Sequence, residues 1–102
     1  MKYLTLWEMD TSKMPSDPKE TADAMTKMID MTKQWLKAHP GAEWGQFIGE
    51  TRGYCVADIS AKELMEVNLM FMPYIQMKNC QAVTINEFEE SFKSTMAKMQ
   101  KK

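Results

Sequence analysis

Hydrophobic residues in this chain follow two different periods. In some segments they alternate with polar residues, which is typical of strands, and in others they recur every three or four residues, which is typical of helices. Lys2–Met9 alternates in this way, whereas the residues after Pro18 repeat at helical spacing. The pattern predicts strands at Lys2–Met9, Glu43–Glu50, Tyr54–Ile59 and Cys80–Ile85, and helices from Pro18 to about Ala38, from Ala61 to about Phe71, and from Asn86 onward.

Residues that start and stop helices support these assignments. Asp17–Glu20, Ser60–Glu63 and Asn86–Glu89 each combine a capping residue with a nearby glutamate, a combination that satisfies the free N–H groups of a first helical turn. His39–Gly41 ends the first helix, because a proline restricts the residue before it and glycine suits a left-handed turn. Pro73 ends or kinks the second helix, so we expect a looser turn over Tyr74–Lys78.

The order strand, helix, strand, strand, helix, strand, followed by a third helix, indicates one ferredoxin-like α+β domain over residues 1–102. The first strand carries Tyr3 and Trp7 on one face and Leu4 and Leu6 on the other. A single layer of helices covers only one face of a sheet. We therefore expect a homodimer in which the second copy covers the other face.

Several segments resemble the dimeric α+β-barrel superfamily, and more closely a small bacterial family of unassigned function within it. The segments that carry this resemblance are Thr5–Trp7, Gly41 to Gly49 with Trp44, Gly53–Asp58, Ser60–Leu64 and Ala82–Ile85. The resemblance covers nearly the whole chain. The chain differs from the superfamily in its longer Asp10–Glu20 loop and in the position of Pro73.

The resemblance implies a four-stranded antiparallel sheet in the order 4-1-3-2, two such sheets packed face to face across a two-fold axis, and a small-ligand cavity between sheet and helices. Members of the superfamily include haem-degrading and quinone-forming monooxygenases, isomerases and sensing domains. In that strand order Cys55 and Cys80 lie on either side of the first strand, roughly 10 Å apart. A disulfide needs Cα atoms within about 7 Å, so we expect free thiols.

Composition excludes some classes of partner. The 102 residues carry a formal net charge of -1, which provides no long-range field to attract nucleic acid or an anionic membrane. The richest apolar run, Leu69–Ile75, is far too short to span a bilayer. No export signal is recognisable at the start of the sequence. We therefore expect a cytoplasmic protein that binds neither nucleic acid nor membrane.

Residues that often perform chemistry are sparse. His39 is the only histidine, so one chain has no multi-histidine metal site, and we expect neither a metal nor a cofactor. His39 lies at a helix C-terminus, where a histidine can be interpreted either as a cap of the helix or as a catalytic base. Cys55 reads as a buried structural thiol or as a nucleophile, which needs a nearby base. Nine of the twelve methionines are spread along three helical stretches, which favours core packing over copper binding.

Aromatic residues are the best candidates for a ligand site. The expected ligand-binding residues are Trp7, Met28, Trp35, Trp44, Tyr54, Asp58 and Met65, with Gln46 or Asn68 as further polar groups. Apolar cavities with few polar groups bind small organic ligands, but an aromatic interior also fills a small core. The alternatives are a cofactor-free monooxygenase or isomerase using Trp44, Tyr54 and Asp58, and an interaction subunit of a larger complex.

Overall fold

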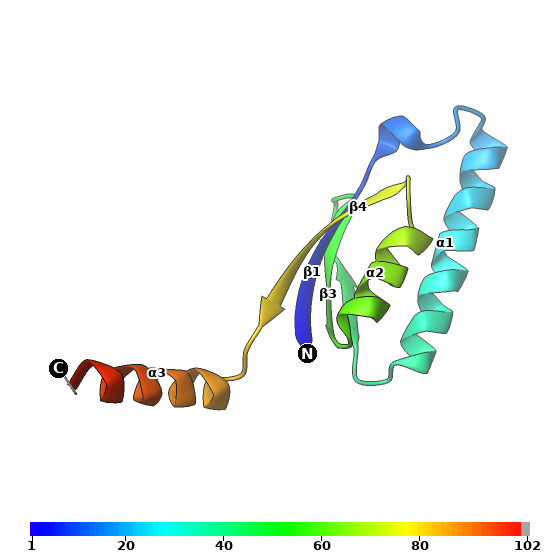
Figure 1. The fold of residues 1–102 in the computed structure, drawn as a ribbon. Coiled ribbons are helices and arrows are strands. Elements are labelled where there is room, and N and C mark those ends of the chain that lie inside the picture. Colours follow the sequence, from blue (N-terminus) through cyan, green and yellow to red (C-terminus); the bar gives the residue numbers. More distant parts are fainter. Residues whose placement is uncertain (101–102) are drawn as a thin grey trace.

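The computed structural model describes residues 1–100, which form an α+β domain with a four-stranded sheet (Figure 1). Three α-helices and one short 3-10 helix accompany the sheet in the described part of the chain. In chain order the elements are β1 (Lys2–Met9), η1 (Thr11–Lys13), α1 (Pro18–Ala38), β2 (Glu43–Gln46), β3 (Arg52–Asp58), α2 (Ala61–Met70), β4 (Ile75–Ala82) and α3 (Ile85–Gln100).

The sheet is antiparallel throughout, in the order β2-β3-β1-β4. This order is the predicted 4-1-3-2 read from the opposite edge, so the predicted topology is confirmed. In the register of the central strand, Thr5 pairs with Cys55 on one side and with Asn79 on the other. Side chains of directly paired residues point to the same face. The register therefore assigns each strand residue to one of two faces.

The face formed by Tyr3, Thr5 and Trp7 lies beneath α1 and α2, which form one layer (Figure 1). Tyr3, Ala57 and Ile59 form the buried cluster at its centre, and Trp35 of α1, Ala42 and Leu64 of α2 pack against it. This arrangement is the ferredoxin-like fold that the element order predicts. No helix of residues 1–100 has both the length and the apolar character needed to cross a bilayer.

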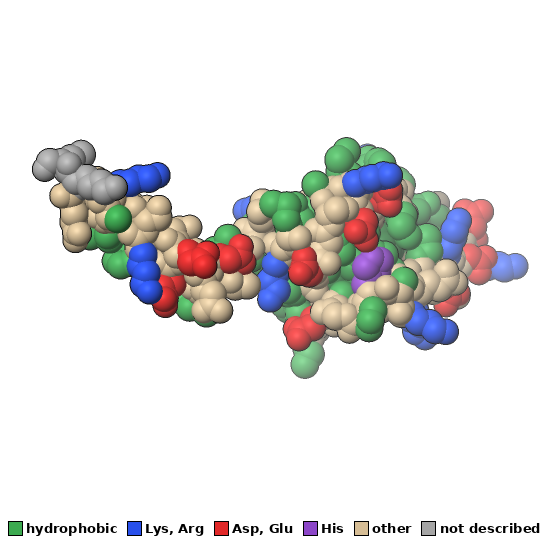
Figure 2. Space-filling model, turned by 60° about the horizontal axis from the view of Figure 1, so that its bottom comes forward, with side chains coloured by type: hydrophobic (Ala, Val, Ile, Leu, Met, Phe, Trp, Pro, Cys, Tyr) green, Lys and Arg blue, Asp and Glu red, His purple; other side chains and the backbone are tan. Residues whose placement is uncertain are grey.

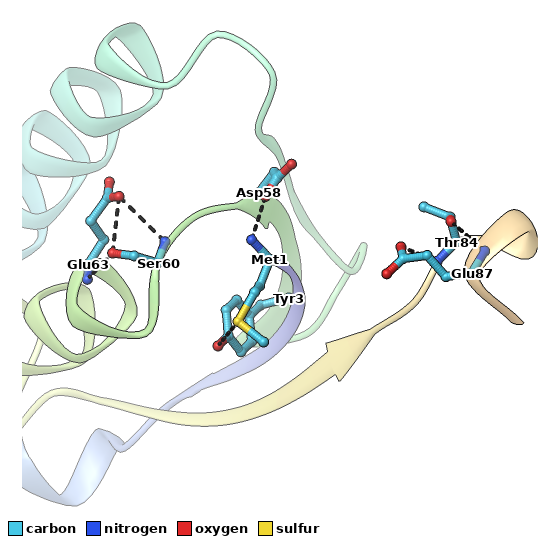
Figure 3. Close-up of polar contacts among 7 residues, drawn as sticks. All are labelled: Met1, Tyr3, Asp58, Ser60, Glu63, Thr84 and Glu87. Atoms are coloured by element: carbon cyan, nitrogen blue, oxygen red, sulfur yellow. Dashed lines mark hydrogen bonds and ion pairs between the residues drawn. The ribbon is translucent and has the colours of Figure 1, made fainter. Parts of the chain in front are cut away.

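The first two helices begin where their capping residues predict. The Asp17 carboxylate accepts a hydrogen bond from the Glu20 amide at 3.1 Å, and α1 runs to Ala38 as expected. At α2 both halves of the Ser60–Glu63 capping box are present (Figure 3). The helix ends at Met70, before Pro73. Local signals therefore located both helices correctly.

The predicted boundaries of the hairpin strands are wrong by several residues. β2 stops at Gln46 rather than at Glu50, and β3 begins at Arg52 rather than at Tyr54. The Phe47 amide bonds back to the Arg52 carbonyl at 3.0 Å, which closes the loop. Gly49 in that loop has φ +78°, a conformation that glycine adopts without strain. Apolar Phe47 and Ile48 gave this loop the appearance of a strand.

The prediction for the last strand is also wrong. β4 covers Ile75–Ala82, so Tyr74–Lys78 is largely strand rather than a looser turn. β4 lies at the sheet edge, where strands tolerate polar and charged residues that obscure the alternation. The strand also ends before Val83, and Thr84 caps α3 in place of Asn86. The Thr84 hydroxyl accepts from the Glu87 amide at 3.2 Å, and the Glu87 carboxylate accepts from the Thr84 amide at 3.1 Å (Figure 3).

The last helix stands apart from the rest of the molecule. Figure 1 shows α3 leaving the end of β4 on the side away from α1 and α2, and every residue of α3 is exposed. The described chain is consequently elongated, 66 × 27 × 26 Å. Figure 2 shows hydrophobic side chains on the surface of the projecting helix as well as on the body.

Candidate functional site

A cleft lies between α1 and the helix-covered face of the sheet. Its inner part is a small pocket of about 50 Å³, and α2 completes its wall. The inner pocket is lined by Tyr3, Thr5, Trp7, Thr32, Trp35, Trp44, Cys55, Ala57, Ile59, Leu64, Val67 and Phe71. A space of this size holds at most one or two water-sized groups, so this part is close to a packed core.

A larger groove of about 380 Å³ adjoins the inner pocket. It is lined by Trp7, Met9, Met25, Met28, Ile29, Thr32, Lys33, Leu36, Trp44, Gln46, Phe71 and Ile75. Trp7, Thr32, Trp44 and Phe71 belong to both linings, so the two spaces share a wall. The groove has the size and apolar character of sites for small organic molecules. We refer to this second space as the cleft groove.

Two stacked indoles form the wall between the groove and the sheet. The rings of Trp7 and Trp44 lie 5.3 Å apart between centroids, with 11° between their planes. Trp7 is 7% exposed and Trp44 is 42% exposed, so the stack runs from the core outward. The Trp7 ring lies close over Gly53, where a Cβ atom would come within 2.5 Å of Cζ2. Glycine at position 53 thus makes room for the inner indole.

Polar groups along the cleft are mostly engaged within the protein. The Thr5 hydroxyl donates to Asn79 Oδ1 at 2.7 Å, and the Thr32 hydroxyl donates to the Met28 carbonyl at 2.8 Å. Gln46 Nε2 donates to the Glu50 carbonyl at 2.7 Å. In contrast, Trp7 Nε1 is buried and has no hydrogen-bond partner among residues 1–100. Most of the polar side chains along the cleft therefore hold its walls in place through hydrogen bonds within the protein.

The residues around the cleft offer little acid, base or nucleophilic chemistry. Lys33 is the only charged residue that lines either space within residues 1–100. Burial raises the pKa of the Cys55 thiol, which lowers the fraction of reactive thiolate at neutral pH. Among the described residues, no group of three or more His, Cys, Asp or Glu side chains is placed to hold a metal ion.

The cleft unites four of the seven residues that the sequence suggested for a ligand site. Trp7, Trp35 and Trp44 line the inner pocket, and Met28 lines the cleft groove together with two of them. The stripe on α1 that contains Met28 also supplies Met25, Ile29, Thr32 and Leu36 to the groove. The helical spacing was the signal for these additional residues. Ile75 was missed because its strand was taken for a turn.

The other three suggested residues lie elsewhere. Tyr54 belongs to the opposite face of the sheet, where its ring covers Gly45 so closely that a Cβ atom would come within 2.5 Å of Cε1. Glycine at position 45 thus makes room for the ring of Tyr54. Asp58 is on the same face as Tyr54, and Met65 is 65% exposed on α2.

Asp58 and His39 both take part in structural ion pairs. The Asp58 carboxylate lies 2.7 Å from the Met1 amine, and this hydrogen bond lowers the pKa of Asp58 (Figure 3). His39 Nε2 lies 2.9 Å from the Glu63 carboxylate, and the imidazole stacks on Trp35 at 4.3 Å between centroids. Hydrogen bonds to Glu63 first and to the Trp35 carbonyl second raise the pKa of His39. His39 therefore joins the end of α1 to the start of α2.

Neither a scan of protein-family models nor a search of curated proteins finds a match to this chain. Function must therefore be inferred from the fold and from the geometry of the cleft.

Proposed function

We propose that this protein binds a small apolar or aromatic organic molecule in the cleft groove. The Trp7–Trp44 stack is the observation that carries the proposal, because its outer ring is left half-open beside an apolar space of about 380 Å³. A planar ligand extends such a stack at the exposed ring. Aromatic pairs contribute about 0.5–1.5 kcal/mol beyond the area that they bury.

Methionines make the groove adaptable to ligands of different shape. Met9, Met25 and Met28 line it from β1 and α1, and their unbranched side chains repack at little cost. Lys33 contributes a positive charge to the same lining. An aromatic ligand that carries a carboxylate would thus bind more tightly than its neutral counterpart.

Binding of 2-naphthoate and 2-naphthol, followed by tryptophan fluorescence, tests this proposal. We expect both probes to quench the emission saturably, and Trp44→Ala to weaken binding about tenfold through lost stacking and lost area. Met65→Ala is the matched control, because Met65 is exposed outside the groove lining. Equal binding to the native chain and to the Trp44→Ala variant would overturn the site. A preference for 2-naphthol would argue against a role for Lys33.

No observation favours the alternative of a cofactor-free monooxygenase or isomerase. Of its three candidate residues, Trp44 lies at the cleft, whereas Tyr54 and Asp58 project from the other face of the sheet. A reaction that used all three in one subunit would need them around a single substrate. Ligand binding needs only the walls of the groove.

The uncovered face of the sheet supports a homodimer, as in dimeric α+β barrels. Leu4, Leu6, Tyr54 and Val56 occupy its centre, and the register pairs Lys2 with Asp58 at one end and Glu8 with Arg52 at the other. We call this surface the open face. Its apolar centre favours burial, and its charges are balanced, so a second copy meets no net repulsion. Packed sheets lie about 10 Å apart, which leaves room for these side chains to interdigitate.

Sedimentation velocity over a range of concentrations tests the homodimer. Leu6 is 42% exposed at the centre of the open face, and Leu6→Glu would place two like charges close together across the two-fold axis. We expect this variant to stay folded and to associate less strongly than the native chain, because the contact between the two open faces is lost. Ile48→Glu is the matched control, because Ile48 lies in the loop outside the sheet. A native chain that stays monomeric at every concentration would refute the homodimer.

A further inference from the structure

Neither the cleft nor the open face explains the apolar stripe of α3. It consists of Ile85, Phe88, Phe92, Met96 and Met99, and all five are exposed, Phe88 at 59% and Phe92 at 55%. A helix of 16 residues is marginal in water without packing on its apolar side. Aromatic side chains on such a stripe normally mark an interaction surface.

The stripe has a symmetric spacing. Its members are separated by three, four, four and three residues, so the pattern reads the same in both directions from Phe92. A second copy of α3 that runs antiparallel, related by a two-fold axis at Phe92, brings Ile85 opposite Met99 and Phe88 opposite Met96. The two Phe92 rings then meet at the axis. Every apolar residue of the stripe gains an apolar partner in this arrangement.

The charges beside the stripe favour the same arrangement. Glu89 and Lys93 lie one turn apart on one flank and form an ion pair of 2.9 Å within the helix. In the antiparallel pair, Glu89 of one copy and Lys93 of the other differ in height by about two residues, roughly 3 Å, which long side chains bridge. In a parallel two-fold pair this flank lies on opposite sides of the interface in the two copies, so Glu89 of one copy cannot reach Lys93 of the other.

We propose that α3 associates with α3 of a second copy as an antiparallel, two-fold-symmetric helix pair centred on Phe92. Such an isologous interface uses the same patch on both chains, as closed dimers do. The proposal uses neither the cleft groove nor the open face. It assigns a second interface between copies, and either interface can fail without the other.

Disulfide trapping of the full chain tests the pair. Helices that pack at 8–10 Å bring facing Cα atoms to about 4–5 Å, because each Cα lies about 2.3 Å from its helix axis. That distance suits a disulfide. In a Cys55→Ala, Cys80→Ser background, Phe92→Cys should therefore form a covalent dimer under mild oxidation at high protein concentration, because the disulfide traps even the weaker pair that remains without the Phe92 ring. Ser94→Cys is the matched control, because Ser94 lies on the opposite side of α3 and should remain monomeric.

Association measured by sedimentation provides a second test that needs no cysteine. Phe92→Glu should weaken the α3 interface by about thirtyfold or more, as expected for loss of a central aromatic contact. Ser94→Glu adds the same charge on the back of the helix and should leave association unchanged. Glu89→Lys should weaken it and adding Lys93→Glu should restore it. Far-UV circular dichroism checks that each variant remains helical.

The outcomes separate this proposal from the open-face homodimer. Equal cross-linking of the Phe92→Cys and Ser94→Cys variants, or none in either, would overturn the α3 pair. If Leu6→Glu abolishes dimers while Phe92→Glu leaves them intact, the open face alone joins the copies and the α3 pair is refuted. If Phe92→Glu alone lowers association, the α3 pair stands without the sheet interface.

Discussion

The helices α1 and α3 share the same pattern of apolar, capping and charged residues, but α1 is packed on the sheet and α3 is exposed. Both are amphipathic, both begin at a residue whose side chain accepts a hydrogen bond from the third amide of the helix, and both carry a basic residue in the last turn. The stripe of α1 packs on the sheet and buries Met28, whereas the stripe of α3 is exposed along its whole length. An amphipathic pattern therefore predicts that a helix forms, and does not tell which surface covers it.

The largest expected difference between the two regions concerns removal of an aromatic side chain. Trp7→Ala takes away a side chain that is 7% exposed, and such truncations typically lower the free energy of unfolding by about 3–5 kcal/mol. Phe92→Ala, at concentrations where the chain is monomeric, should change it by less than about 0.5 kcal/mol. Urea unfolding followed by circular dichroism measures both values.

If Phe92→Ala in dilute solution lowered the free energy of unfolding as much as Trp7→Ala does, α3 would pack on its own subunit in solution. An increase of the Phe92→Ala effect with protein concentration is instead expected if α3 pairs with a second copy, because association stabilises the folded state by mass action.

The two faces of the sheet show how far the sequence could predict the fold. Alternation in β1 placed Trp7 and Leu6 on opposite faces correctly, because a strand has a strict period of two. The polar residues of β4 concealed the start of that strand, since an edge strand pairs on one side only. Thr84 was assigned to a strand because β-branched residues favour strands, although its hydroxyl caps α3.

The candidate site was only partly predictable, because local residue patterns identify the faces of single elements but not how the strands pair. Helical spacing located Met28 on the inner side of α1, and an aromatic in the first strand located Trp7. Tyr54 was expected at the ligand site and lies on the opposite face. The face that its ring takes depends on the pairing register of β2 with β3, which alternation within one strand does not determine. The stacking of Trp44 on Trp7 depends on how β2, β3 and β1 pair. The pattern of residues within each strand does not predict this pairing.

An intermediate effect is expected from removing helix caps in the two regions. Ser60→Ala removes a capping box at the start of α2, which packs on the sheet, and should lower the global free energy of unfolding by about 1 kcal/mol. Thr84→Ala removes the corresponding bonds at the start of α3. This loss should reduce helicity near 222 nm without moving the urea midpoint of tryptophan fluorescence.

The measurement separates the regions because Trp7, Trp35 and Trp44 all lie in the body of the molecule. If Thr84→Ala shifted the fluorescence midpoint as much as Ser60→Ala does, α3 would unfold together with the sheet and the comparison drawn above would be wrong.

The smallest expected effect concerns pH and the pair that joins α1 to α2. The hydrogen bond to Glu63 raises the pKa of His39 above 6.5, and the same bond lowers the pKa of Glu63 below 4.5. The raised pKa stabilises the fold below pH 6.5, and this contribution is lost as the pH rises through the folded-state pKa of His39. The lowered pKa of Glu63 adds stability above pH 4.5, which is lost on acidification.

The pair should therefore contribute most between pH 4.5 and 6.5. Native chain and His39→Gln variant can be compared by thermal unfolding at about pH 5.5 and about pH 8.5, either side of the histidine titration. The native chain should be the more stable at the lower pH, and the difference should shrink at the higher pH. His39 is the only histidine of the chain, and Glu63 is ionised at both pH values because its pKa lies below 4.5. The remaining titrations are common to both proteins and cancel. If the difference in thermal stability between the two proteins stayed constant with pH, the ion pair with Glu63 would contribute nothing. The contribution of His39 would then come from its stacking on Trp35 alone.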